Sequence, residues 1–177
     1  MRIYIEAIKE DEKSAVYGLL ERAVGDEYGI AMPELITDMY GKPMFPEETG
    51  IYFSLSHSGG LAMCAVDSRP VGADIQKIRE VPDRVKKRLC TETELAGADF
   101  ISLWCMKESF IKLRGRLDRA YRRVEFLPDG ELFRGPEGAL ARLLNVPDGY
   151  RAAVCGTLEE KHPPIMCANC SEIPVDY

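Results

Sequence analysis

The chain has 177 residues, a formal net charge of −6, 46% hydrophobic residues and 29% charged residues. This length suffices for one domain, or for two small halves that share a core, and the composition is ordinary for a globular protein. The negative charge argues against a dedicated nucleic-acid-binding protein, and no apolar run is long enough for a transmembrane helix.

The compartment is expected from the N-terminal residues and the cysteines. The segment Met1–Glu6 becomes acidic too early for a signal peptide, so we expect a cytoplasmic protein that does not act at a membrane. Without an export signal, the cysteines that lie in apolar or helical contexts are expected to be reduced and mostly buried. These are Cys64, Cys90, Cys105 and Cys155.

The first half of the chain is predicted to consist mainly of strands. Arg2–Ile8 alternates apolar and polar residues, which predicts a strand, and apolar residues at helical spacing predict a helix over Ser14–Ala23 that ends near Gly25. Two prolines and a glycine make Gly41–Pro46 a loop. Three strands follow, separated by the turn compositions Ser-His-Ser-Gly-Gly and Asp-Ser-Arg-Pro. They are Ile51–Leu55, Leu61–Val66 and Val71–Ile75.

The second half begins with helices and ends with strands. A short basic helix is predicted over Pro82–Cys90, a capping box over Thr91–Glu94 starts another helix, and a long helix runs from Asp99 to Arg114. A hairpin, a short helix or irregular stretch, and a strand follow. These are Arg122–Phe133, Pro136–Leu144 and Tyr150–Leu158. The order strand, helix, strands, helices, strands predicts an α+β fold with antiparallel sheets.

The C-terminal residues, His162–Tyr177, contain three prolines and little periodicity, and we expect a surface extension. Cys167 and Cys170 form a Cys-x-x-Cys pair there. A zinc site would need two further ligands, and only His162 is close, so a disulfide or no role is preferred.

The long helix carries an acid and a base one turn apart. Its core stripe is predicted to contain Leu103, Met106, Phe110 and Leu113. Glu108 and Lys112 lie on the opposite side, where the simple alternative is an exposed ion pair at i, i+4. Apolar residues beside the pair, including Trp104 at its edge, indicate instead that this face is covered or lines a cleft.

Other candidate residues lie near the ends of the predicted strands. Asp74 could hold Mg²⁺ jointly with Glu108, because Mg²⁺ takes one or two carboxylates and completes its shell with phosphate and water. His57 could contact a phosphate, with hydroxyls of the neighbouring serines. Lys42 is a cation in a loop stiffened by proline. A turn cap, a solvated histidine and a surface lysine are the respective alternatives.

Taken in order, these segments resemble the 4′-phosphopantetheinyl transferase family, in the larger, pseudo-symmetric type that acts on carrier proteins of secondary metabolism. The family pattern is a Gly-Lys/Arg-Pro loop, a Ser-His-Ser turn, Val-Gly-x-Asp-Ile-x and a Trp-x-x-Lys-Glu-x-x-x-Lys helix. Its counterparts in this chain are Gly41–Pro43, Ser56–Ser58, Val71–Gln76 and Trp104–Lys112.

The resemblance implies an enzyme that moves 4′-phosphopantetheine from coenzyme A to a serine of an apo acyl or peptidyl carrier protein and releases 3′,5′-ADP. It implies two similar α+β halves, each a small antiparallel sheet with a long helix, packed as an intramolecular pseudo-dimer that is sufficient as a monomer. The expected divisions are residues 1–75, 76–158 and an extension over 159–177.

The resemblance also implies roles for individual residues. Asp74 and Glu108 would bind Mg²⁺, with Gln76 acting through a water molecule, and Asp74, Glu108 and Lys112 would be catalytic. Glu108 would act as, or position, the base for the carrier serine, and Lys112 would steady the phosphates. The residues expected to hold coenzyme A are Lys42, Ser56, His57 and Lys107.

Two departures from the family pattern support an alternative function. Gln76 stands where members usually have a third carboxylate, and Ser14-Ala15 stands where an Arg-Thr pair is common. The alternative is a catalytically weak relative that binds coenzyme A or a carrier protein without efficient transfer. An unrelated acidic Mg²⁺ enzyme is a third hypothesis.

Overall fold

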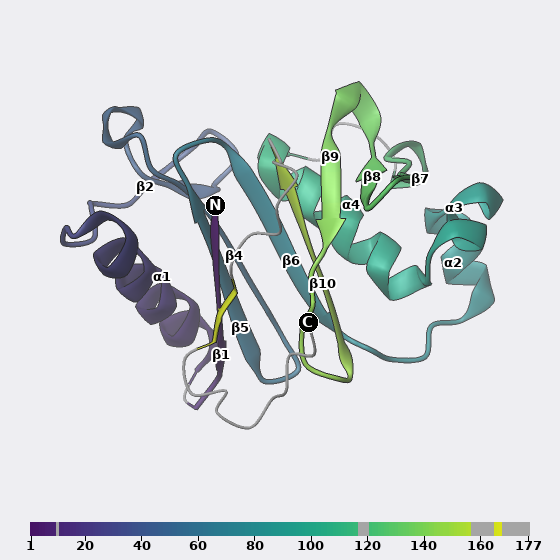
Figure 1. The fold of residues 1–177 in the computed structure, drawn as a ribbon, viewed down its shortest axis with the longest axis horizontal. Coiled ribbons are helices and arrows are strands. Elements are labelled where there is room, and N and C mark those ends of the chain that lie inside the picture. The colour runs from purple at the N-terminus through teal and green to yellow at the C-terminus, as the bar shows by residue number, and fades with distance from the viewer. Residues whose placement is uncertain (10, 117–120, 157–164, 168–177) are drawn as a thin grey trace.

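The computed structural model describes residues 1–9, 11–116, 121–156 and 165–167 (Figure 1). Its longer elements are the strands β1 (Arg2–Ala7), β4 (Tyr52–Ser58), β5 (Leu61–Asp67), β6 (Val71–Lys77), β9 (Leu140–Leu143) and β10 (Tyr150–Gly156) and the helices α1 (Glu12–Tyr28) and α4 (Phe100–Arg114). Its shorter elements are β2 (Ile36–Thr37), β3 (Pro43–Met44), β7 (Leu127–Asp129), β8 (Leu132–Arg134), β11 (Ile165–Cys167), α2 (Asp83–Leu89), α3 (Glu92–Gly97) and the 3₁₀ turns η1 (Glu47–Thr49), η2 (Tyr121–Arg123) and η3 (Pro136–Gly138).

Two sheets form the centre of the molecule. One has the strand order β11-β1-β5-β4 and the other β6-β10-β9-β8-β7. Apart from the parallel β1–β11 pair, neighbouring strands are antiparallel. Figure 1 shows α1 beside the first sheet and α4 beside the second. The expected α+β class with antiparallel sheets is confirmed.

Three apolar cores fill the spaces between these layers. One lies between α1 and the first sheet, around Leu20 and Val66, and a second lies between α4 and the second sheet, around Met106 and Phe126. The third joins the two sheets directly and includes Ile5, Met63 and Ile75. Because β1, β5, β6 and β10 contribute to this shared core, the two sheets fold as one unit.

Several predicted boundaries differ from the structure. The first helix continues past Gly25 to Tyr28 and ends at Gly29, which adopts the left-handed conformation with φ of 66°. The stretch expected to be helical or irregular over Pro136–Leu144 is a single 3₁₀ turn followed by the strand β9. The predicted division at residue 75 falls inside β6, which pairs with β10 along its whole length.

Only a short part of the expected C-terminal surface extension lies within the described residues. Backbone residues Ile165–Cys167 form β11, which adds an edge strand to the first sheet beside β1. Cys170 and His162 lie outside the described residues. Among the described helices, none combines the length and the apolar character needed to cross a membrane.

Serine hydroxyls join the two sheets where their edge strands β4 and β6 meet. Ser54 and Ser58 accept hydrogen bonds from the backbone N–H groups of Ala73 and Lys77, at 2.9 and 3.0 Å. Ser56 accepts from Ile75 N at 3.3 Å. Alternate residues of a strand share one face, so Ser-x-Ser-x-Ser places three hydroxyls in a row. We call this row, Ser54, Ser56 and Ser58, the serine seam.

Gly72 allows α4 to lie directly on β6. A Cβ atom at this position would lie 1.8 Å from the Ser109 carbonyl oxygen and 2.6 Å from the Leu113 nitrogen. Both are backbone atoms, so no side-chain rotation could relieve the clash. The Gly in the Val-Gly-x-Asp segment is therefore required for the approach of the helix that carries Glu108 and Lys112.

We expect Gly72→Ala to lower the free energy of unfolding by about 3 kcal/mol or more, because the added methyl group would push α4 off the sheet. Gly18→Ala is the matched control. Gly18 lies inside α1, and no atom lies within 4 Å of the point that an added methyl group would occupy, so its replacement should be neutral or stabilise by up to about 1 kcal/mol. Urea unfolding of both variants measures the difference, and an unchanged midpoint for Gly72→Ala would contradict the packing argument.

Candidate active site

The candidate site lies where β6 faces α4. Because side chains alternate along a strand, Gly72, Asp74 and Gln76 point to the same side of β6, and Gly72 touches α4. Asp74 and Gln76 therefore face the helix that carries Glu108 and Lys112. Asp74 was predicted to lie near the end of a strand. It lies inside β6 instead, and it is only 2% exposed.

Hydrogen bonds occupy both carboxylate oxygens of Asp74. Its Oδ1 accepts from Ser56 Oγ and from Lys112 Nζ, each at 2.7 Å. Its Oδ2 accepts from Gln76 Nε2 at 3.0 Å. Burying a carboxylate is costly unless it is paired and hydrogen-bonded in this way. The structure thus brings Asp74, Lys112, Ser56 and Gln76, all predicted site residues, into one network.

Glu108 is half-buried near this network and is paired with a residue that the sequence did not single out. Its Oε1 accepts a hydrogen bond from the phenol of Tyr121. Burial raises the pKa of Glu108 above its ordinary value, and the negative charge of Asp74 raises it further. The Tyr121 hydrogen bond and the Lys112 ammonium act in the opposite direction. Glu108 therefore holds a proton more readily than an exposed glutamate.

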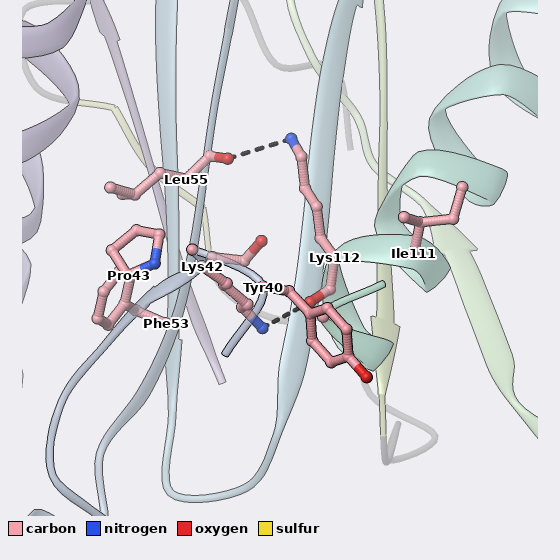
Figure 2. Close-up of a pocket in the computed structure, with 10 residues that line it drawn as sticks. Tyr40, Lys42, Pro43, Phe53, Leu55, Ile111 and Lys112 are labelled. Carbon is pink, nitrogen blue, oxygen red and sulfur yellow. Dashed lines mark hydrogen bonds between the residues drawn. The ribbon is translucent and has the colours of Figure 1, made fainter. Parts of the chain in front are cut away.

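Lys112 links the network to a neighbouring cavity of about 330 Å³, shown in Figure 2. Besides Asp74, its ammonium donates to the Leu55 carbonyl at 3.1 Å, and its side chain is 28% exposed. Lys42 lines the same cavity and donates to the Lys112 carbonyl at 2.5 Å, near the C-terminal end of α4. Burial holds the pKa of Lys42 below its ordinary value. Two lysine side chains thus border one cavity.

The Ser-His-Ser segment was predicted to be a turn, but it forms the end of β4. The turn is formed by Gly59 and Gly60, with φ of 56° and 95°, which suits a two-residue hairpin. Strand alternation puts His57 on the opposite face from Ser56. The His57 side chain is 44% exposed, and its Nδ1 lies 3.1 Å from Glu12 Oε2. His57 is therefore outside the Asp74 network.

Lys107 does not occupy the position expected of a coenzyme A ligand. Its side chain is fully buried, and its ammonium lies 2.7 Å from Glu94 Oε1. It also donates to the carbonyls of Val124 and Tyr121, at 2.6 and 3.2 Å. A phosphate of coenzyme A could not reach this nitrogen without unfolding the core, so the predicted role is wrong.

The arrangement suits chemistry on a phosphorylated ligand. It provides two carboxylates, Asp74 and Glu108, beside the ammonium of Lys112 and a cavity with a second lysine. Hard carboxylate oxygens are the protein ligands that Mg²⁺ prefers, and one or two of them suffice when phosphate and water complete the shell. In the described part of the chain, no group of three or more His, Cys, Asp or Glu residues could hold a metal ion.

Sequence reasoning did not identify Tyr121. Its ring stacks on Trp104, with ring centroids 5.2 Å apart and planes inclined by 9°. The two residues are far apart in the sequence, so no spacing rule connects them. The apolar edge beside Glu108, with Trp104, was the available signal, because it indicated that this face of the helix is covered.

Comparisons with known proteins agree with these features. A family model described as the 4′-phosphopantetheinyl transferase superfamily matches residues 70–155. A 4′-phosphopantetheinyl transferase of Bacillus subtilis is 34% identical over 168 residues, covering 83% of this chain and 75% of that protein. The transferase Sfp of Bacillus subtilis strain 168 is 33% identical with the same coverage. The transferase HetI of Nostoc sp. is 32% identical over 116 residues, covering 55% of this chain and 49% of that protein.

We expect Lys107→Met to lower the free energy of unfolding by about 3–5 kcal/mol, because it leaves the buried Glu94 carboxylate without its cation. The double variant Lys107→Met/Glu94→Gln should lose less than the single variant, since it removes both charges. Denaturant unfolding of the two variants and of the parent chain provides the comparison. If Lys107→Met unfolds like the parent chain, the buried pair has no structural importance.

Proposed function

Because the chain belongs to the 4′-phosphopantetheinyl transferase superfamily, in its Sfp-like type, and is therefore a transferase of phosphopantetheine, we propose that it takes 4′-phosphopantetheine from coenzyme A with Mg²⁺. The acceptor is a serine of an apo acyl or peptidyl carrier protein, and 3′,5′-ADP is released. The observation that carries the proposal is the cluster of Asp74, Glu108 and Lys112 beside a lysine-lined cavity.

The residues of the cluster divide the reaction between them. The carrier serine oxygen forms a bond to the phosphorus that carries pantetheine, and the bond from this phosphorus to the bridging oxygen breaks. The bonding electron pair leaves on 3′,5′-ADP, and the serine proton passes to Glu108. The raised pKa of Glu108 suits this role, because a base works best when its pKa is near the working pH.

Lys112 and Lys42 supply positive charge to the phosphates. The Lys112 ammonium already lies at the junction of Asp74 and the cavity, so a small movement would bring it to a phosphate oxygen. Phosphoryl transfer depends mainly on positioning and on neutralising charge that develops on oxygen. Ser56 contributes by holding Asp74 at 2.7 Å. His57 would reach coenzyme A only from the outer face of β4.

The donor set fits Mg²⁺. Asp74 and Glu108 are the two carboxylates that would hold the ion. When bound, the ion would neutralise negative charge on the pyrophosphate of coenzyme A. The Gln76 amide lies against Asp74 and not away from the site, which supports a role in orienting a metal-bound water. With one carboxylate fewer than is usual in the family, the protein alone should bind Mg²⁺ weakly.

The arrangement of the halves also forms part of the proposal. One longer helix lies on each sheet, α1 on the first and α4 on the second, which supports two similar halves in one chain. The two sheets share a core, so a single copy of the chain could contain a complete site. We propose that the protein acts as a monomer and in the cytoplasm.

Two observations favour the catalytically weak relative as the second candidate. Gln76 provides no charge to a metal, and His57 is paired with Glu12 on the face away from Asp74. Such a protein would bind coenzyme A or a carrier protein without efficient transfer. The two candidates differ in the rate of transfer, which can be measured directly.

We expect the chain to add phosphopantetheine to at least one of several apo carrier proteins when coenzyme A and Mg²⁺ are present, measured as the mass increase of the carrier. Glu108→Ala and Lys112→Ala should each lower the rate by orders of magnitude, since each removes a group that contacts the reacting phosphate or serine. Arg134→Ala, which breaks an exposed ion pair with Asp129, is the control and should transfer normally. No mass increase with any carrier would favour the second candidate, and parent-like rates for both variants would remove the site assignment.

We expect Gln76→Glu to lower the Mg²⁺ concentration needed for half-maximal transfer, because a charged oxygen replaces a neutral amide. Asp74→Asn should raise that concentration sharply or abolish transfer. A Mg²⁺ titration at saturating coenzyme A compares the variants. An equal or higher requirement for Gln76→Glu would place Gln76 away from the metal.

A further inference from the structure

Tyr121, which begins η2, is held against one face of α4 by three different contacts. Its ring stacks on Trp104, its phenol donates to Glu108, and its carbonyl accepts from Lys107 at 3.2 Å. Positions 104, 107 and 108 are related as i, i+3 and i+4, so they lie next to each other on the helix surface. Ring, hydroxyl and backbone of one residue thus match one short stretch of helix.

The chain that follows Tyr121 is anchored to the protein core. Lys107, which holds the Tyr121 carbonyl, also binds the Val124 carbonyl and is ion-paired with the fully buried Glu94. Glu94 Oε1 accepts from the backbone nitrogen of Phe126 at 3.0 Å, and Phe126 is itself fully buried. The segment from Tyr121 to Phe126 is therefore fixed at both ends, which allows the phenol to be placed accurately.

Glu108 needs such a restraint because two charged groups, the Asp74 carboxylate and the Lys112 ammonium, lie close to it. A glutamate side chain has three rotatable bonds, and Lys112 is one helical turn away, at the spacing that favours an ion pair. In the structure Lys112 pairs instead with Asp74, and Glu108 pairs with Tyr121. The Tyr121 phenol therefore holds the Glu108 carboxylate in its observed orientation and keeps it from turning toward Lys112.

We propose that Tyr121 is a positioning residue for Glu108. Its hydroxyl fixes Oε1, so that Oε2 faces the carrier serine and the phosphates; this rests on the proposed role of Glu108 in transfer. Stacking on Trp104 fixes the plane of the Tyr121 ring, and the hydrogen bond from Lys107 fixes the position of the Tyr121 backbone along α4. The Lys107 of the Trp-x-x-Lys-Glu segment thus contributes to the reaction through Tyr121 and not through a phosphate.

Tyr121→Phe is the test, because it keeps the ring, the stack and the backbone carbonyl and removes only the hydroxyl. We expect kcat to fall about 10- to 100-fold, the range typical when a partner that orients a metal-binding side chain is lost, since Glu108 is also a proposed Mg²⁺ ligand. The KM for coenzyme A should stay within about twofold, since Tyr121 is not among the residues that line the cavity. This split separates a positioning role from a general loss of binding.

The single tryptophan of the chain gives a structural readout at the same place. Trp104 emission should be the same in Tyr121→Phe and in the parent chain, because the stacked ring is retained. Tyr4→Phe is the matched control. It removes another phenol–glutamate hydrogen bond, from Tyr4 to Glu27 at 2.9 Å, on the first sheet, and should keep the parent kcat.

The outcomes are distinct. A parent-like kcat for Tyr121→Phe, or a fall accompanied by displaced Trp104 emission, would overturn the proposal, the second because the segment itself would then have moved. A kcat lost equally in Tyr4→Phe would also overturn it. If Glu108→Ala transfers normally, the proposed role of Glu108 is the part that fails. A fall in Glu108→Ala with none in Tyr121→Phe removes the role of Tyr121 alone.

Discussion

The contact on which the rest of the structure depends is the serine seam between the two sheets. β4 and β6 are edge strands, and an edge strand has backbone N–H groups without partners in its own sheet. Here the hydroxyls of Ser54, Ser56 and Ser58 accept from alternate N–H groups of β6. Each bond contributes only about 1 kcal/mol, but leaving a buried N–H unpaired would cost more.

The serine seam also positions a residue of the candidate site, because Ser56 contacts Asp74. Ser56 uses its acceptor for the backbone of β6 and its proton for the Asp74 carboxylate. The same hydroxyl therefore fixes the position of the second sheet and the direction of the Asp74 carboxylate. Gly72, two residues before Asp74, lets α4 lie close enough for Lys112 to reach that carboxylate.

Two ion pairs that involve lysines of α4 differ in their surroundings. Lys107 and Glu94 are fully buried and connect α4 to the segment after it, whereas Lys112 and Asp74 lie at the edge of a cavity. Removing one partner of a fully buried pair leaves an isolated charge in the core, which is costly. The exposed side of the second pair, by contrast, leaves Lys112 able to change partners. Two lysines of one helix thus lie in different surroundings, Lys107 in the core and Lys112 at the edge of a cavity.

The sequence by itself determined the α+β class, the longer strands and helices apart from β9, and the residue types of the Asp74, Glu108 and Lys112 cluster. Those features follow from local periodicity, from glycine and proline, and from an ordered motif. Only the tertiary structure decided that Lys107 faces the core, because a lysine on a helix covered on several sides cannot be distinguished from an exposed one by spacing. Only the tertiary structure turned His57 outward, since its face depends on where β4 ends. The pairing of Tyr121 with Glu108 joins residues that no local period relates, and packing alone brings them together.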